Sequence, residues 1–385
     1  MNLDLTEDQK MIKDMAENFA KTELEPVAAK LDEADDRGTF LKNLKKAAEL
    51  GLMGVNVKSE YGGSEAGVVA FSLAITEIGK ACASTGVTTS VNNMVCEVIQ
   101  AIGSEEQKKT YIPKICSGEY PAGGFGLTET TAGSDPAGMR CSAVLDGNEW
   151  VLNGNKIFIT SAEYAGVFVV WAITDKSAPK GKGISTFLVE NGTKGFTVGR
   201  AEHKMGQHAS VTNELVFEDC RIPKTAIMGK LHDGFRTAVG ELAGGRIGIG
   251  SLGLGIGQAA IEYATKYATE RKQFNQSISE FQAIQWMIAE STTELEAARL
   301  LLMNAAFKKE KGRPFGRAAS MAKYYATEAA ERACYNAMQI LGGYGYTREF
   351  PVERFARDVR ITSVYEGTNQ IQRVIIARDI LSSFK

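Results

Sequence analysis

The segment Tyr365-Glu366-Gly367-Thr368 places a carboxylate directly before a predicted helix, for which Thr368 is a suitable N-cap. A glycine follows Glu366, so the backbone can come close to a bound ligand. When an apolar ligand removes water from a carboxylate, the pKa of that carboxylate rises, and a glutamate becomes a useful base near neutral pH. Glu366 is therefore a candidate proton acceptor, although a capping or solvated glutamate would give the same local pattern.

Two other segments have the composition of ligand-binding loops. Residues 125–135 offer small residues, hydroxyl groups and free backbone N–H groups, which suit phosphate or the edge of a flavin. Residues 271–274, followed by Phe281 and Gln282, could hold a phosphate or an aromatic ring. A third glycine-rich segment, 339–346, ends a predicted long helix. Each also has an ordinary explanation: a connecting loop, solvated charge and a helix stop, respectively.

Residues 248–253 formally match the GxGxxG pattern of nicotinamide-binding loops, and Glu270 lies at a plausible distance for a ribose contact. That reading requires a strand immediately before the first glycine. The preceding residues, 235–246, predict a helix or a turn, and further glycines follow at a spacing of two. We therefore interpret this run as a tightly packed helix.

The elements that carry these segments fall into three regions. Residues 1–120 predict helices, the first of which begins with a capping box formed by Thr6 and Gln9. Residues 121–230 contain short β-type runs and predict an antiparallel domain, a sandwich or a barrel, with a hairpin turn at Asn153-Gly154. Residues 231–385 predict an antiparallel helical bundle with long helices over 281–310 and 315–341 and a final helix ending near Leu381.

The composition narrows the classes of function. The 385 residues allow two or three domains at ~150 residues each. Lys plus Arg total 44 and Asp plus Glu total 46, so the net charge of -2 gives no footprint for nucleic acid or an anionic membrane. No uncharged run reaches the ~18 residues of a membrane span, and no targeting peptide is visible. Six scattered cysteines and three histidines indicate reduced thiols and no metal site. We expect a cytoplasmic protein or a mature protein of an organelle matrix.

In this order and on this layout, the motifs resemble the flavin-dependent acyl-CoA dehydrogenases, most closely the short-chain, butyryl-CoA type. The resemblance runs from LTEDQ through EYGG, GLTETTAGSD, NGNKIFITSA, ELAGGRIGIG, RKQF and QILGGYGY to YEGTNQIQR. It implies an α+β fold with an N-terminal helical domain, a central antiparallel β domain and a C-terminal four-helix bundle. It also implies FAD as the cofactor, an acyl-CoA substrate, an electron-transferring flavoprotein as electron acceptor, and a homotetramer.

The resemblance assigns roles to residues. Glu366 matches the base that removes the α-proton of the thioester while the β-hydrogen leaves as hydride to FAD N5, which gives a trans-2-enoyl-CoA. The backbone N–H of Glu366 matches a donor to the thioester oxygen. Substrate contacts match Ser134, Arg246, Tyr365 and Gly367. Cofactor contacts match Phe125, Leu127, Thr128, Gly133, Ser134, Phe158, Ile159, Thr160, Arg271, Phe274, Gln282, Gln339, Leu341, Gly342, Gly343, Thr368 and Gln370, of which 339–343 correspond to a contribution from a neighbouring subunit.

Three positions bear on the site. Some family members carry the base immediately before the arginine that Arg246 matches, but this chain has Gly245 there, which leaves Glu366 as the candidate. Ala243 stands where the short-chain pattern often has an aspartate, which weakens the substrate contacts assigned to this segment. Glu97 is an unexpected charge in a segment that resembles the lining of the acyl pocket. We expect Glu97 to face solvent; otherwise it serves an unusual acyl group, such as a cyclic one.

The leading hypothesis is an enzyme that dehydrogenates a short, branched or alicyclic acyl-CoA. The same fold could instead reduce an enoyl-CoA, use O2 as an oxidase, or carry out 1,4-dehydrogenation of a cyclic enoyl-CoA. A non-catalytic CoA-binding paralogue is a further alternative, against which the retained Glu366 and the complete flavin-contact set argue.

Overall fold

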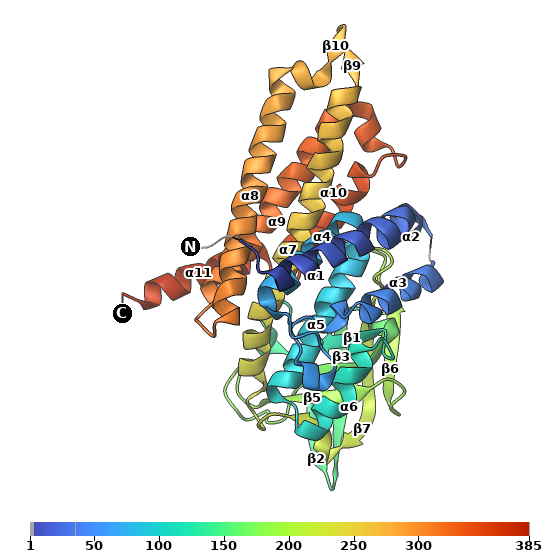
Figure 1. The fold of residues 1–385 in the computed structure, drawn as a ribbon. Coiled ribbons are helices and arrows are strands. Elements are labelled where there is room, and N and C mark those ends of the chain that lie inside the picture. The colour runs from blue at the N-terminus through green and yellow to red at the C-terminus, as the bar shows by residue number, and fades with distance from the viewer. Residues whose placement is uncertain (1–3, 35, 385) are drawn as a thin grey trace.

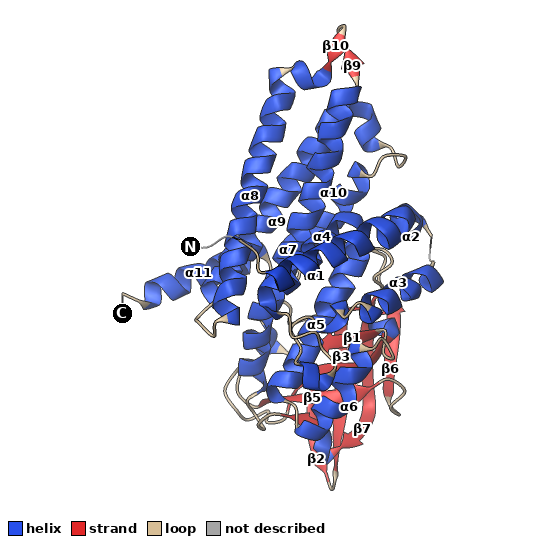
Figure 2. Cartoon of the chain, in the orientation of Figure 1, coloured by secondary structure: helices blue, strands red, loops and turns tan. Residues whose placement is uncertain are grey.

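The computed structural model describes residues 4–34 and 36–384. Along the chain, one large sheet follows a first set of helices and precedes a second set, and in space it lies at one end of the molecule (Figures 1 and 2). Thr6 and Gln9 form the predicted capping box, with each side chain accepting a hydrogen bond from the other's backbone N–H. The helices before the sheet are α1 (Glu7–Phe19), α2 (Ala28–Glu33), α3 (Arg37–Glu49), α4 (Gly67–Ala81), α5 (Ala83–Ile102) and α6 (Glu105–Cys116).

The main sheet has the strand order β6-β7-β3-β2-β4-β5-β8, with β1 paired to β4. Most neighbours are antiparallel, as predicted, but β1 and β2 both run parallel to β4, so the sheet is mixed. Its strands are β1 (Ala122–Gly126), β2 (Ser142–Asp146), β3 (Glu149–Thr160), β4 (Ala165–Ile173), β5 (Ile184–Glu190), β6 (Phe196–Ala201), β7 (Thr212–Pro223) and β8 (Ile227–Met228).

The predicted hairpin turn at Asn153-Gly154 is wrong, because β3 runs straight through these residues. The turn lies instead between β2 and β3, where Asp146 pairs with Glu149. Gly154 has a φ of 133° at a register shift against β7, and a Cβ there would lie 2.7 Å from the Cα of Cys141. The glycine thus serves a bulge and a close backbone approach rather than a turn.

The helices after the sheet confirm the predicted bundle elements. They are α7 (Gly234–Glu270), α8 (Gln282–Glu310), α9 (Gly316–Leu341), α10 (Val352–Arg360) and α11 (Asn369–Ser382), with a hairpin of β9 (Lys272–Gln273) and β10 (Gln276–Ser277) between α7 and α8. The GxGxxG run lies inside α7, with no strand before it, so it is not a nicotinamide loop. Gly255 is packed so closely that a Cβ there would lie 2.1 Å from the carbonyl oxygen of Thr76 on α4.

Two buried contacts join the helices to the sheet. The side chain of Asn92 on α5 accepts the N–H of Gly123 on β1 at 2.9 Å. The indole of Trp171 on β4 donates to the carbonyl of Gly234, the first residue of α7, at 2.9 Å. From that anchor, the 37 residues of α7 extend about 55 Å, and Figure 1 shows the β9–β10 hairpin at the end of the molecule opposite the sheet.

No helix in the described residues is long and apolar enough to cross a membrane. The six cysteines are all buried free thiols. The domain boundaries at residues 120 and 230 stay predictions; helices precede the first and follow the second in the observed element order.

Candidate active site

Glu366 lies in the turn between α10 and α11, where it adopts a left-handed backbone with a φ of 56°. Gln372 on α11 holds this turn, since its amide donates to the carbonyls of Glu366 at 3.1 Å and Gly367 at 2.8 Å. The carboxylate points at α7: a Cβ on Gly245 would lie 2.7 Å from Oε2 of Glu366 and 2.7 Å from Sδ of Met94. The site therefore needs a glycine at 245, the position where other family members are expected to carry the base.

The electrostatics of Glu366 suit a base at neutral pH. Its Oε2 atom is buried and has no hydrogen-bond partner in the described chain. Burial raises the pKa of Glu366 to about 7, against the opposing effect of the positive charges of Arg246 and Lys323. A carboxylate with a pKa near the working pH is ionised enough to accept a proton and basic enough to hold it.

Arg246 follows Gly245 on α7 and is 5% exposed. Its guanidinium donates to the hydroxyl of Ser320 on α9 at 3.3 Å, while its Nε has no partner in the described chain. Burial lowers the pKa of Arg246, and the charge of Glu366 opposes that effect. Two unpartnered buried polar atoms, one on Arg246 and one on Glu366, mark this as a site for a polar ligand.

Tyr365 is fixed by the loop between β6 and β7. The amide of Gln207 donates to the hydroxyl of Tyr365 at 3.2 Å and to the carbonyl of Asp358 at 3.0 Å, and the backbone N–H of Gln207 donates to the Asp358 carboxylate. Burial raises the pKa of Asp358 to about 6 and also raises the pKa of Tyr365. The residue before the candidate base is thus held by the sheet region and by α10 together.

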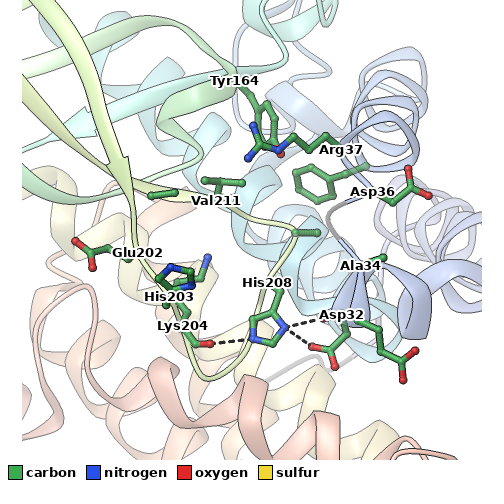
Figure 3. Close-up of a pocket in the computed structure, with 14 residues that line it drawn as sticks. Asp32, Ala34, Asp36, Arg37, Tyr164, Glu202, His203, Lys204, His208 and Val211 are labelled. Atoms are coloured by element: carbon green, nitrogen blue, oxygen red, sulfur yellow. Dashed lines mark hydrogen bonds and ion pairs between the residues drawn. The ribbon is translucent and has the colours of Figure 1, made fainter.

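The same β6–β7 loop borders a cavity of about 410 Å³ against α2 and α3 (Figure 3). His208 contacts the carboxylate of Asp32 at 3.0 Å and the carbonyl of Lys204 at 2.9 Å. Arg357 of α10 binds both carboxylate oxygens of Asp32, at 2.9 Å to Oδ1, which His208 also contacts, and at 2.5 Å to Oδ2. None of the residues that line this cavity was predicted as a site residue. The contacts of His208 and Arg357 with Asp32, and of Arg357 with the carbonyl of Met205, anchor the loop that carries Gln207.

The predicted cofactor residues of the β region lie together. The carbonyl of Thr128 accepts the N–H of Ile157 at 2.9 Å, which ties the 127–134 loop to β3, where Phe158, Ile159 and Thr160 follow. Gly133 and Ser134 are exposed on this loop, and Leu127 is buried. Phe125 packs on Trp171, with ring centroids 4.5 Å apart. Phe158 is 60% exposed with a left-handed φ of 60°, so its ring stands out from the sheet.

A fully buried ion pair supports this loop. Nζ of Lys156 lies 2.7 Å from Oε1 of Glu129 and 3.3 Å from the carbonyl of Leu127. Glu129 also accepts the backbone N–H groups of Arg140 and Cys141. The pair therefore sets the path of the 127–134 loop from beneath.

The remaining predicted cofactor residues form two separate groups. Thr368 and Gln370 open α11 beside Glu366, where Thr368 caps the helix through the N–H of Ile371. The others lie around the far end of the bundle, where the guanidinium of Arg271 sits 5.7 Å from the ring centre of Tyr344. This end carries exposed Phe274, Gln282, Gln339, Gly342 and Gly343, together with buried Leu341. One chain therefore does not bring the bundle-end group together with the β-region group (Figure 1).

The expectation that Glu97 faces solvent is wrong. Its side chain is 14% exposed and forms an ion pair with Lys309 of α8 at 2.6 Å. Asn56 donates to its other carboxylate oxygen, also at 2.6 Å. The pair lies against Gly244, where a Cβ would be 3.4 Å from Glu97 and 2.6 Å from Lys309. Glu97 therefore belongs to a neutralised, mostly buried cluster next to the residue pair Gly244-Gly245.

Sequence reasoning missed Lys156, Glu129, Gln207 and Lys323. For Lys323 a signal existed, because it lies on a helical stripe of alanines at 319, 322, 326 and 330, all buried. A lysine on such a stripe must be buried and must have partners. For Gln207 the sequence offers no comparable signal.

The residues present fit a flavin dinucleotide. Gly133, Gly342 and Gly343 have open space around the position of a Cβ, as loops that approach a large ligand require. Thr368 and Gln370 stand at the N-terminus of a 14-residue helix, which favours phosphate. The exposed ring of Phe158 offers an aromatic surface beside the 127–134 loop.

This fold and site define a flavin-dependent enzyme, and comparison with known proteins shows the family to which it belongs. Family models described as the N-terminal, middle and C-terminal domains of acyl-CoA dehydrogenase match residues 6–119, 124–220 and 232–381. The chain belongs to the acyl-CoA dehydrogenase family, whose members are FAD-dependent oxidoreductases acting on CH–CH bonds.

Two relatives and one solved structure show how similar it is. The short-chain specific acyl-CoA dehydrogenase of Clostridium acetobutylicum is 42% identical over 99% of this chain and 100% of its own length. The NADH-dependent acryloyl-CoA reductase of Anaerotignum propionicum is 43% identical over 99% of this chain and 96% of its own. The structure of butyryl-CoA dehydrogenase from Megasphaera elsdenii superimposes with a TM-score of 0.95 at 38% identity, covering 99% of this chain and 100% of that one.

Proposed function

We propose that this protein dehydrogenates a short, branched or alicyclic acyl-CoA to the trans-2-enoyl-CoA, with Glu366 as the base. The observation that carries the proposal is the buried, unpartnered Oε2 of Glu366, held beside Gly245 with a pKa raised to about 7. A buried carboxylate oxygen without a hydrogen-bond partner lowers the free energy of unfolding. Groups of this kind gather at functional sites, and here the oxygen is free to accept a substrate proton.

The residues of this chain provide binding, orientation and charge. Glu366 accepts the α-proton, and its left-handed backbone presents an N–H for the thioester oxygen. The positive charges of Arg246 and Lys323 favour the ionised carboxylate before the transfer and the developing enolate during it. FAD would be held by Phe125, Leu127, Thr128, Gly133, Ser134, Phe158, Ile159, Thr160, Thr368 and Gln370, and it would supply the capacity to accept the β-hydrogen as hydride.

Anaerobic titration of the flavin absorbance with straight, branched and cyclic acyl-CoAs tests this function. We expect bleaching by the preferred substrate, and its loss in Glu366→Gln with the flavin still bound. Glu296→Gln serves as the matched control, because this carboxylate is 53% exposed on α8 and pairs with Arg299. Full-rate bleaching by Glu366→Gln would remove the residue from the mechanism.

Enoyl-CoA reduction is the second candidate, favoured by the relative that is named as an acryloyl-CoA reductase. The same site can run in this direction, with the protonated Glu366 returning its proton to the α-carbon. Product analysis after mixing reduced enzyme with an enoyl-CoA, or oxidised enzyme with the saturated acyl-CoA, separates the two directions. An electron-transferring flavoprotein as acceptor for the dehydrogenation rests on the sequence resemblance, and its reduction during turnover would test it.

We also propose a homotetramer, because within one chain the predicted cofactor residues at the end of the bundle lie far from those in the β region. Arg271 and Tyr344 lie together at the bundle end, about 55 Å along α7 from the sheet. We expect them, with Gln339 to Gly343, to complete the cofactor site of a neighbouring copy. Coexpression of Arg271→Ala with Glu366→Gln then restores bleaching in mixed assemblies, although each variant alone fails. No restoration in assemblies shown by mass spectrometry to be mixed would contradict this arrangement.

A further inference from the structure

Lys323 is a fully buried lysine in the first half of α9, with 0% of its surface exposed. Its backbone packs against α7 at Gly250, where a Cβ would lie 3.3 Å from the Cα of Lys323. A buried ammonium group is strongly unfavourable unless polar partners surround it. The groups that accept hydrogen bonds from the Lys323 ammonium therefore indicate its role.

The two hydrogen bonds that the Lys323 ammonium makes within residues 4–34 and 36–384 go to the turn that carries Glu366. Nζ donates to the carbonyl of Gly367 and to the side-chain oxygen of Asn369, each at 3.0 Å. Asn369 is held in turn by Thr327, one turn further along α9, through its amide at 3.0 Å. Glu366 and Thr368, the candidate base and a predicted cofactor contact, lie in this clamped segment.

We propose that Lys323 is a positioning residue for the catalytic turn, whose ammonium group fixes the backbone that carries Glu366 and the first turn of α11 and adds a second positive charge near the Glu366 carboxylate. The inference rests on the proposed function of Glu366 and extends it to a residue that holds the turn on which Glu366 lies. A neutral donor could make the same two hydrogen bonds. The proposal therefore assigns the positive charge of Lys323 a role of its own, which is to favour the ionised form of Glu366.

The charged groups around Glu366 come from several elements. Arg246 of α7 and Lys323 of α9 act on the carboxylate directly. The Glu97–Lys309 pair of α5 and α8 is neutral, and Asp358 of α10 acts on Tyr365.

Glu328 and Glu331 lie further along α9 and act on Lys323. Burial lowers the pKa of Lys323 to about 7, and the negative charge of Glu366 opposes that effect. Each ionised group thus stabilises the other, and the positive charges of Arg246 and Lys323 together favour a developing enolate near Glu366.

The test separates the charge from the hydrogen bonds in the flavin-loaded enzyme. Lys323→Gln keeps a donor but removes the charge, Lys323→Met removes both, and Thr327→Val removes a partner of Asn369 and keeps the charge. We measure the flavin retained on purification and the pH dependence of anaerobic bleaching.

In Lys323→Gln and Lys323→Met, the acid limb of the bleaching profile is expected to move to higher pH, which makes the ratio of the rate at pH 6 to the rate at pH 9 about tenfold smaller than in the unmodified enzyme. Lys323→Met and Thr327→Val are expected to retain less flavin, and Thr327→Val to leave the limb in place. Loss of flavin or stability without movement of the limb in either lysine variant would reduce Lys323 to a structural residue and overturn the proposal.

Two further variants keep the outcome decisive. If both lysine variants fail to fold, Asn369→Ala, which removes one acceptor and keeps the charge, is expected to lose flavin with an unmoved limb; undiminished flavin would refute the positioning role. Glu366→Gln is run in parallel. If it bleaches at full rate, the proposed base is wrong, whereas an inactive Glu366→Gln with unshifted Lys323 variants leaves the base in place and removes only the role of Lys323.

Discussion

The ion pair between Lys156 and Glu129 is expected to be a main support of the flavin-facing loop, and removing its cation gives a sharp test. Lys156 is fully buried, and the Glu129 side chain is 4% exposed. Lys156→Met leaves the carboxylate buried without its cation, which costs about 3–5 kcal/mol of the free energy of unfolding. Because Lys156 also holds the carbonyl of Leu127, the same change is expected to weaken flavin retention.

The double variant Lys156→Met/Glu129→Gln tests whether the cost of Lys156→Met comes from the unpaired charge of Glu129. A glutamine is neutral and can still accept one of the two N–H groups that Glu129 accepts, so the double variant is expected to be more stable than Lys156→Met alone. Urea unfolding followed by circular dichroism, with release of flavin fluorescence, measures both effects.

Arg221→Met is the matched control on the paired strands β7 and β3. Arg221 binds Glu149 at 3.1 Å, but the two side chains are 49% and 48% exposed, so this substitution is expected to cost less than about 1 kcal/mol. A Lys156→Met variant no less stable than Arg221→Met, or a double variant less stable than Lys156→Met, would refute the reasoning.

Three further outcomes follow from the site. The pKa of Glu366 is raised to about 7, and its ionised form is the base. The bleaching rate is therefore expected to fall as the pH drops through 7, from about nine tenths of the full rate at pH 8 to about one tenth at pH 6. A stopped-flow bleaching rate that stays constant across this range would contradict the prediction. Gly245→Ala would place a Cβ 2.7 Å from the Glu366 carboxylate and is expected to lower the bleaching rate at least about tenfold, whereas Gly240→Ala on the same helix has open space and leaves it unchanged. Gln207→Leu removes the amide that donates to the Tyr365 hydroxyl and is expected to lower the free energy of unfolding, measured in urea, by about 1–3 kcal/mol. An unchanged free energy of unfolding would contradict this prediction.

Local chemistry predicted the helices well because their end signals act over a few residues. The capping box at Thr6, the stop at Gly342 and the cap at Thr368 all occur as predicted. The same local reasoning failed at Asn153-Gly154, where a strong turn signal lies inside a strand. The pairing of β3 with β7 and the close approach of Cys141 determine the backbone there, and neither is visible within the segment.

The order of the motifs along the chain was enough to indicate the family, the cofactor and Glu366 as the candidate base, because motif order and residue type are properties of the sequence itself. The sequence could not determine the state of that base. Glu366 meets Gly245 from 121 positions away and the charges of Arg246 and Lys323 from α7 and α9, and these neighbours together with burial set its pKa. Desolvation and Coulomb interactions depend on distances in space. Only the folded chain therefore decided that Oε2 of this carboxylate has no hydrogen-bond partner among the residues that the structure describes, and that a buried lysine holds the turn on which it lies.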